Sequence, residues 1–353
     1  MEKLTDQQVV TLTLGWSHER STWDYIASFG ESADTLYWKT RTAWGIRGGQ
    51  AELLLAVENY LTVDRAEVIV LELYSRVKEI EGRLLLATLD QFDQRIRAEP
   101  KLIEAQNLDF YLQQIFSALR ERDDVTSADI AIREYRYLSL LRESRVYSRD
   151  SHALELDKFM AENPEFYVQI LSDVFSPASE RGQNKDVTER ERAKAHIGWT
   201  LLEGFVSIPG QTGDQIDIEQ LKTWVAEVRR LAEVSDRLKI AEEKIGALLA
   251  HAPEDPGDKL WPHSIVRYCL EQWSSDSIEH GLLIERINMR GVTRRLPKDG
   301  GQQERDLAEG IRNGAKGLGA WPRTQALLRS LAAHWDEVAK REDIRVQQME
   351  MRE

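Results

Sequence analysis

Six cationic residues surround three glycines in the segment RINMRGVTRRLPKDGGQQER, residues 286–305. Several forked guanidinium groups beside a glycine-rich backbone can bind phosphates or the carboxylates of an acidic protein. The alternative is a solvated connector between two helices whose arginines pair with nearby acids, as surface charge runs usually do. We favour the connector and keep its cations as the candidate partner-binding residues. They are Arg286, Arg290, Arg294, Arg295, Lys298 and Arg305.

A second basic and aromatic segment is REYRYLSLLRESRVYSR, residues 133–149. Its arginines at helical spacing are Arg142, Arg145 and Arg149, and its tyrosines are Tyr135, Tyr137 and Tyr147. Tyrosines next to arginines can stack on unpaired bases. The leucines of the same segment indicate that it also builds core, which favours a structural role. Local nucleic-acid binding through residues 133–149 and 286–305 is therefore the alternative function.

The familiar catalytic and cofactor motifs are missing from the sequence. GVTRRLPKDGG does not have the order of a Walker A loop, and there is no HExxH, GxSxG or dinucleotide-binding motif. His251 and His263 bracket Asp255 and Asp258 in a proline-rich loop, but without the compact spacing of a metal site. Cys269 occupies an apolar helical position, which predicts a buried thiol. We therefore predict no catalytic residue, cofactor or metal; the enzyme alternative would need an unfamiliar helical active site.

Four tryptophans lie close together near the N-terminus and raise the possibility of a binding surface. They are Trp16, Trp23, Trp38 and Trp44. Trp16, Trp23 and Trp38 belong to apolar stripes, so we predict that most of this group packs in the core.

Composition and charge limit the classes of partner. The 353 residues contain 47 Lys and Arg against 60 Asp and Glu, a net charge of -13, so a generally cationic surface for DNA or anionic lipid is absent. The single cysteine fits a reducing compartment. The start MEKLTDQQVV lacks the basic and apolar parts of a signal peptide, and no apolar run is long enough to span a bilayer. We expect a soluble, cytoplasmic protein without a membrane partner.

The hydrophobic pattern is helical along most of the chain. Apolar residues recur three and four positions apart in segments of about 10 to 20 residues, separated by short breaks such as SFGES, RDDVTS and VSD. AEVIVLEL contains β-branched residues, but its flanks continue the helical pattern, so we predict a helix there. Thr126 or Ser127 is predicted to cap one helix, and Pro164 to begin another.

Two segments share an unusual beginning, WPHSIVRYCLEQW at residue 261 and WPRTQALLRSLAAHW at residue 321. In each, proline fixes a helix start and the preceding tryptophan can fold back as a hydrophobic staple. No fixed repeat period covers the chain. The sequence therefore predicts an all-α fold, either an irregular α-solenoid or two lobes of stacked helical hairpins.

The polar stretch SPASERGQNKDV interrupts the apolar periodicity and predicts a domain boundary. The expected organisation is an N-terminal helical lobe at 1–175, a linker at 176–187, a C-terminal helical lobe at 188–341 and a charged tail at 342–353.

Several segments together carry a resemblance to a known class of protein. They are WPHSIVRYCLEQW, ERINMRGVTRR, GGQQERDLAEGIR, LDFYLQQIFSALRE and EFYVQILSDVFSP. The chain resembles the helical C-terminal regions of large bacterial multidomain proteins, some of them antiviral NTPases of the STAND type or sirtuin-like defence proteins. In those, an α-solenoid serves as the sensor. The resemblance implies a non-catalytic helical scaffold or sensor that binds a protein partner in bacterial antiviral defence, with any NTPase or effector supplied from elsewhere.

Overall fold

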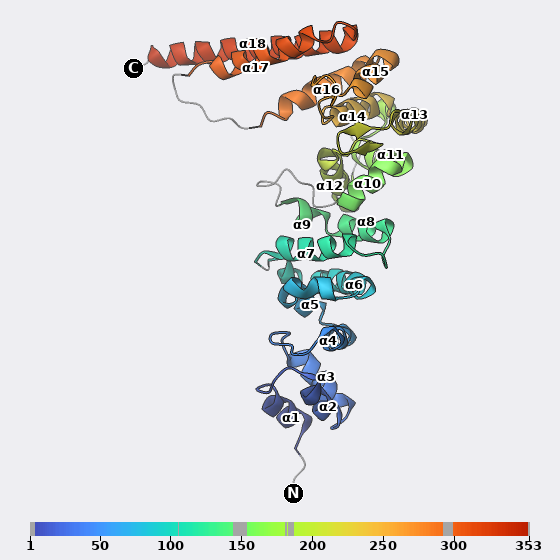
Figure 1. The fold of residues 1–353 in the computed structure, drawn as a ribbon, viewed down its shortest axis with the longest axis vertical. Helices are drawn as coiled ribbons and strands as arrows, with labels where there is room; N and C mark the ends of the chain where they lie inside the picture. Colours follow the sequence, from blue (N-terminus) through green and yellow to red (C-terminus); the bar gives the residue numbers. More distant parts are fainter. Residues whose placement is uncertain are drawn as a thin grey trace. The chain divides into compact units, whose positions relative to one another are not determined.

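The computed structural model describes residues 4–104, 106–143, 154–180, 182, 187–291 and 299–351. Helices supply nearly all the regular structure in these ranges (Figure 1), and the strands there form one small hairpin, β1 (Gln211–Thr212) and β2 (Gln215–Ile216). The predicted all-α class is therefore confirmed. Packing divides the chain into two compact units, Met1–Phe159 and Met160–Glu353.

The first unit is a succession of short helices whose starts follow local rules. The α-helices are α1 (Asp6–Thr13), α2 (Arg20–Ala27), α3 (Glu31–Thr40), α4 (Gln50–Thr62), α5 (Ala66–Glu72), α6 (Gly82–Ala98), α7 (Leu108–Arg120), α8 (Ser127–Arg136), α9 (Leu138–Glu143) and the beginning of α10 (Leu154–Glu162). Two 3₁₀ helices, η1 (Tyr74–Glu79) and η2 (Pro100–Glu104), lie between them. Thr126 caps α8 as predicted, and Asp129 returns the hydrogen bond to complete a capping box.

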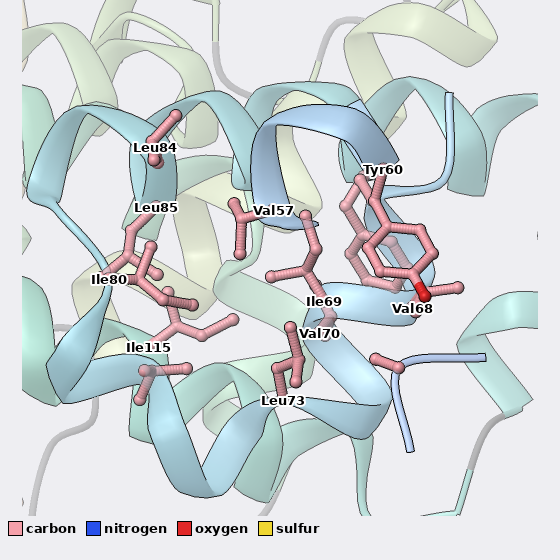
Figure 2. Close-up of a cluster of buried hydrophobic side chains, with 14 of the residues drawn as sticks. Val57, Tyr60, Val68, Ile69, Val70, Leu73, Ile80, Leu84, Leu85 and Ile115 are labelled. Atoms are coloured by element: carbon pink, nitrogen blue, oxygen red, sulfur yellow. The ribbon is translucent and has the colours of Figure 1, made fainter. Parts of the chain in front are cut away.

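One continuous apolar core runs through this unit. Figure 2 shows Val57 of α4 close to Ile69 and Val70 of α5, with Leu85 of α6 and Ile115 of α7 beside them, and all five belong to the same buried cluster. The segment AEVIVLEL forms α5, so the predicted helix is confirmed over the β-strand alternative. Its β-branched side chains are buried here by neighbouring helices rather than by a sheet.

The second unit contains the longer helices. They are α11 (Pro164–Val174), α12 (Glu189–Gly204), α13 (Ile218–Val234), α14 (Leu238–Leu249), α15 (Ser264–Trp273), α16 (Asp276–Asn288), α17 (Gln302–Lys316) and α18 (Pro322–Glu350), with the 3₁₀ turn η4 (Ala178–Glu180). Pro164 opens α11 and Pro322 opens α18, as predicted. The second Trp-Pro segment thus begins its helix at the proline. In the first, α15 begins after His263, whose side chain accepts a hydrogen bond from the amide of Ile265.

The packing division lies earlier than the polar stretch at 176–187. Helix α11 contacts α12 and α13, so the residues just before the polar stretch belong to the second unit. The segment predicted as a charged tail, 342–353, begins within α18, which continues to Glu350. Asp343 on this extension accepts hydrogen bonds from Arg305 and from the amide of Gly301, which ties the end of α18 to α17.

Helices α14 and α16 approach each other unusually closely at a pair of glycines. A Cβ atom added at Gly246 would lie 1.9 Å from the carbonyl oxygen of Ile278, and one added at Gly281 would lie 1.9 Å from the carbonyl oxygen of Glu243. Each glycine therefore sits against the backbone of the opposite helix. Backbone cannot move aside as a flexible side chain can, so any larger residue forces the two helices apart.

The substitution Gly246→Ala is expected to lower the free energy of unfolding of the second unit by about 3 kcal/mol, because the helix pair must separate. Gly310→Ala is the matched control, since nothing lies within 4 Å of a Cβ atom there. That control is expected to raise stability by about 0.5 to 1 kcal/mol through helix propensity. Urea denaturation of the two variants measures both effects. Equal free energies of unfolding for Gly246→Ala and Gly310→Ala would show that the close approach of α14 and α16 does not contribute to stability.

Candidate interaction surface

Three of the six predicted partner-binding cations lie in the described residues, and two of these stack on tryptophans. The Arg286 guanidinium lies 4.1 Å from the ring centre of Trp261, and the Arg290 guanidinium lies 4.8 Å from that of Trp335. Arg290 also forms an ion pair with Glu304, which is fully buried. These arginines therefore join α16 to the first Trp-Pro segment and to α17 and α18.

The third cation, Arg305, pairs with Asp343 at 2.6 Å and joins α17 to α18. Arg294, Arg295 and Lys298 lie outside the described residues. The described part of the arginine segment is therefore engaged in internal contacts, as the connector interpretation expects. Partner binding by this segment stays a prediction.

Residues 133–149 are likewise tied into the first unit as far as the structure describes them. Arg133 and Arg136 both pair with Asp90 at 2.5 Å, which fixes α8 against α6. Tyr137 is buried and donates its hydroxyl to the carbonyl of Leu89 at 2.6 Å. Residues 144–149, with Tyr147 and two of the candidate arginines, lie outside the described residues.

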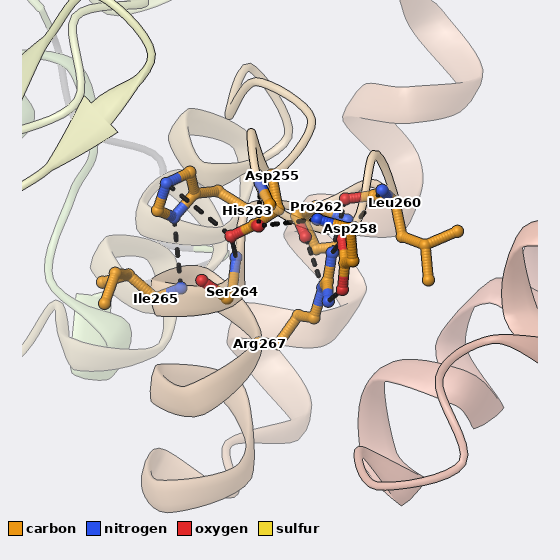
Figure 3. Close-up of polar contacts among 9 residues, drawn as sticks. Asp255, Asp258, Leu260, Pro262, His263, Ser264, Ile265 and Arg267 are labelled. Carbon is orange, nitrogen blue, oxygen red and sulfur yellow. Dashed lines mark hydrogen bonds and ion pairs between the residues drawn. The ribbon is translucent and has the colours of Figure 1, made fainter.

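The proline-rich loop before α15 is organised around Asp255 (Figure 3). Its carboxylate accepts hydrogen bonds from the amides of Ser264 at 3.0 Å and Gly257 at 2.8 Å. These bonds, those from Ser264 above all, hold the pKa of Asp255 well below its usual range. Arg267 is buried and donates hydrogen bonds to both carboxylate oxygens of Asp258, at 2.5 and 2.9 Å. The loop is therefore a structural hydrogen-bond network, in which Asp255 accepts from backbone amides and Asp258 accepts from Arg267.

The two loop histidines that the sequence singled out do not come together at a metal. His263 faces Asp255, with 3.9 Å between Nε2 and Oδ2, whereas His251 pairs with Glu285 at 3.3 Å. The hollow beside His251 has room for little more than a water molecule. Within the described ranges, no group of three or more His, Cys, Asp or Glu side chains is arranged to hold a metal ion. Cys269 is buried as predicted, and burial raises the pKa of its thiol to about 12.

The most unusual polar group of the first unit is His18, which the sequence reasoning did not single out. Its imidazole is buried and receives the indole N–H of Trp23 on Nδ1 at 2.9 Å. An indole nitrogen only donates, so the neutral ring carries its proton on Nε2, which faces the Tyr60 hydroxyl at 3.1 Å. The Tyr37 hydroxyl lies 3.0 Å from Nδ1, and Trp38 packs at 5.6 Å between ring centres. We call these five residues the His18 cluster.

Burial keeps the His18 imidazole neutral. It lowers the pKa of His18 to about 3, and the positive charge of Arg41 acts in the same direction. The only signal of this in the sequence is a lone histidine between Trp16 and Trp23 in an aromatic-rich segment. That pattern does not reveal which hydroxyl groups complete the cluster, because they come from α3 and α4.

The backbone of His18 joins two loops that each carry an exposed tryptophan. His18 forms a parallel bridge with Ile46, and its carbonyl accepts the amide of Arg47 at 2.8 Å. Arg41 spans the same loops by donating to the carbonyls of Leu14 and of Trp16, the latter at 3.0 Å. The loop before α2 and the loop after α3 are therefore fastened to each other and, through the imidazole, to the core.

Four aromatic side chains stand out from this fastened region. The exposed fractions are 48% for Trp16, 44% for Tyr25, 42% for Phe29 and 79% for Trp44. Trp16 contacts Tyr25 with 5.2 Å between ring centres, and Tyr25 contacts Phe29 at 5.1 Å. We call Trp16, Tyr25, Phe29 and Trp44 the aromatic surface. Core packing was predicted for most of Trp16, Trp23 and Trp38, and Trp16 is the exception, because its half-exposed ring packs beside Tyr25 of α2.

Trp23 and Trp38 are buried, as predicted from their apolar stripes.

Comparison of the chain with protein-family models, with curated proteins and with solved structures finds no match. Among the described residues, no helix has both the length and the apolar character that crossing a bilayer requires. The surface must therefore be interpreted from its own geometry.

Replacing Arg290 by methionine is expected to destabilise the second unit by about 3 to 5 kcal/mol, because the buried carboxylate of Glu304 loses its counter-charge. Arg312→Met removes an arginine from a partly exposed pair with Asp336 between α17 and α18 and serves as the control. That control is expected to cost less than about 1 kcal/mol. Urea denaturation of both variants decides the point; equal losses would contradict the structural role of Arg290.

Acid is expected to destabilise the first unit through His18. The pKa of His18 in the folded chain lies below its ordinary value of 6.5. The contribution of neutral His18 to the free energy of unfolding is therefore complete above pH 6.5, and it is lost as the pH falls toward 3. Burial raises the pKa of Glu134 to about 7, which acts in the opposite sense. Comparison with His18→Gln isolates the histidine, since an amide accepts from Trp23 and donates to Tyr60 without titrating.

The stability advantage of the wild-type chain over His18→Gln should shrink by about 2 kcal/mol between pH 6.5 and pH 5. Urea unfolding followed over this range measures the difference. A pH-independent gap for His18→Gln would mean that the imidazole is not kept neutral by the fold.

Proposed function

We propose that this chain is a non-catalytic helical scaffold that binds a protein partner through the aromatic surface. The observation that carries the proposal is the exposure of Trp16 and Trp44 on loops that His18 and Arg41 hold in place. An exposed aromatic side chain on a flexible segment does not by itself indicate a binding surface. The loops that carry Trp16 and Trp44, however, have their backbone fixed to the core through His18 and Arg41.

The energetics of protein interfaces favour this assignment. Tryptophan and tyrosine are enriched among the residues that contribute most to binding, because they bury a large area with few rotatable bonds. Binding also costs less when the contacting groups are already ordered. Trp16 lies two residues before His18 and Trp44 two residues before Ile46, so the bridge between those residues holds the backbone beside both tryptophans in place before a partner arrives.

Three acid–base groups with shifted pKa values, His18, Asp255 and Glu134, support a scaffold rather than an enzyme. The His18 ring is surrounded by Trp23, Tyr37 and Tyr60, and Asp255 is engaged by backbone amides. Glu134 is buried against Arg120 at 2.9 Å and accepts the amide of Leu156. A catalytic acid or base needs a free approach to its substrate, and each of these groups instead satisfies neighbours in its own unit.

The resemblance to sensor regions of bacterial defence proteins suggests where the partner acts. A helical sensor without an NTPase or effector of its own would work by binding a protein that carries one, or by binding the product of an invading virus. We therefore place the proposed interaction in antiviral defence. Nucleic-acid binding through residues 133–149 and 286–305 is the competing assignment, and the described arginines of both segments are used in internal contacts.

Affinity enrichment from lysates of native cells, uninfected and infected, tests the proposal. The wild-type chain should retain at least one protein that the variant Trp16→Ala/Trp44→Ala retains about tenfold less, because two ordered anchors are lost. Ile132→Ala/Val234→Ala removes equally exposed apolar side chains elsewhere and should retain it fully. Identical retention by all three chains, or retention of nothing, would contradict the proposal.

A further inference from the structure

We infer that the partner segment received by the aromatic surface is an acidic peptide that also carries apolar side chains. The inference rests on the proposed function and specifies its ligand. It follows from a juxtaposition: the exposed tryptophans lie beside a cationic loop in a chain that is otherwise acidic.

The loop that carries Trp44 contains only positive charge. The stretch KTRTAWGIRGG, residues 39–49, includes Lys39, Arg41 and Arg47 and no acidic residue, although the whole chain has 60 acids against 47 Lys and Arg. Lys39 and Arg47 are exposed. Arg41 directs its guanidinium at the carbonyls of Leu14 and Trp16, which leaves its charge without a carboxylate.

This lack of counter-charge distinguishes the loop from most of the first unit, where Arg122 is another cation that binds only carbonyls. Elsewhere in the first unit, Arg20 pairs with Asp24 at 2.9 Å, Lys78 pairs with Glu121 at 2.8 Å and Arg97 pairs with Asp93 at 2.8 Å. Within the described residues, Lys39, Arg41 and Arg47 form no such pair with a carboxylate.

The acids that contact this loop bond its backbone rather than its cations. Glu72 accepts the amide of Ala43 at 2.7 Å, and Glu52 accepts the amide of Gly49 at 2.8 Å. On the other side of the aromatic surface, Asp24 is held by Arg20. The cations of the loop can therefore pair with a ligand that supplies its own carboxylates.

The arrangement of the rings favours apolar side chains as the other half of the ligand. Trp16 and Tyr25 are tilted by 38°, and Tyr25 meets Phe29 at 70°. Rings inclined in this way do not offer a row of parallel faces for stacked bases, whereas leucine, methionine or phenylalanine side chains can pack against them at any angle. A peptide that alternates acidic and apolar residues would match both features.

The charge of the chain argues against a polynucleotide. Three phosphate contacts on a single strand give a salt dependence of only about 2 in log-log slope, which is weak retention at physiological ionic strength. The net charge of -13 would oppose any strand that extends beyond the loop. A short peptide carries few charges beyond the loop, and repulsion over more than about 8 Å is largely screened at physiological ionic strength.

Selection of a displayed library of random short peptides on the full chain at physiological salt tests the inference. Peptides enriched on the wild type should combine Asp or Glu with large apolar residues, and should be lost on Trp44→Ala. The affinity of the best peptide should fall at least about tenfold for Lys39→Glu/Arg47→Glu, which leaves Arg41 and the His18 cluster intact. Lys78→Ala/Arg83→Ala, exposed cations of the same unit, should leave it unchanged.

The other outcomes separate the inference from the proposed function. Neutral or basic peptides whose binding depends on Trp44 would overturn the acidic ligand and leave the protein-binding surface in place. Oligo-deoxythymidine or oligo-uridine bound more tightly than any peptide, again through Trp44, would overturn both in favour of a nucleic-acid surface. Failure to enrich any ligand that depends on Trp44 would also overturn both.

Discussion

The first unit depends on keeping one imidazole neutral. His18 is buried among Trp23, Tyr37, Trp38 and Tyr60, so each ring nitrogen must find a partner inside the protein. The indole of Trp23 and the hydroxyl of Tyr60 meet that requirement only if α2 and α4 stand in their observed places. The same residue then joins two loops through its backbone, and in this way a requirement of the core determines how the outer surface is presented.

A similar rule operates in the second unit, where buried charges connect the helices. Arg290 lies between the ring of Trp335 and the carboxylate of Glu304, and Arg267 holds Asp258 beneath the first Trp-Pro segment. Two of the candidate partner-binding arginines, Arg286 and Arg290, thus take part in packing. The first unit presents a different kind of surface, built from aromatic rings and a loop without acids.

The fold class and several helix starts could be predicted from local patterns. Periodicity placed the helices, and Thr126, Pro164 and Pro322 begin theirs by rules that act within one turn. The AEVIVLEL segment was predicted correctly as helix because its flanks keep the helical period. These features depend on neighbours in sequence, which is the information a single chain supplies.

The candidate site could not be predicted in the same way. His18 acquires its role from hydroxyl groups on α3 and α4, and Trp16 occupies an apolar stripe whose outer edge no helix covers. The stacking of Arg286 on Trp261 likewise joins segments separated by a helix and a turn. Helical spacing states which residues share a face; it does not state which faces remain uncovered after packing.

The most direct test of the central claim is ¹⁹F NMR of the chain labelled with fluorotryptophan, recorded while a partner enriched from the native lysate is added. If the aromatic surface receives the partner, the resonances of Trp16 and Trp44 shift together, and the resonance of Trp199, which is 46% exposed in the second unit, does not shift. A shift at Trp199 with Trp16 and Trp44 unchanged would contradict binding through the aromatic surface.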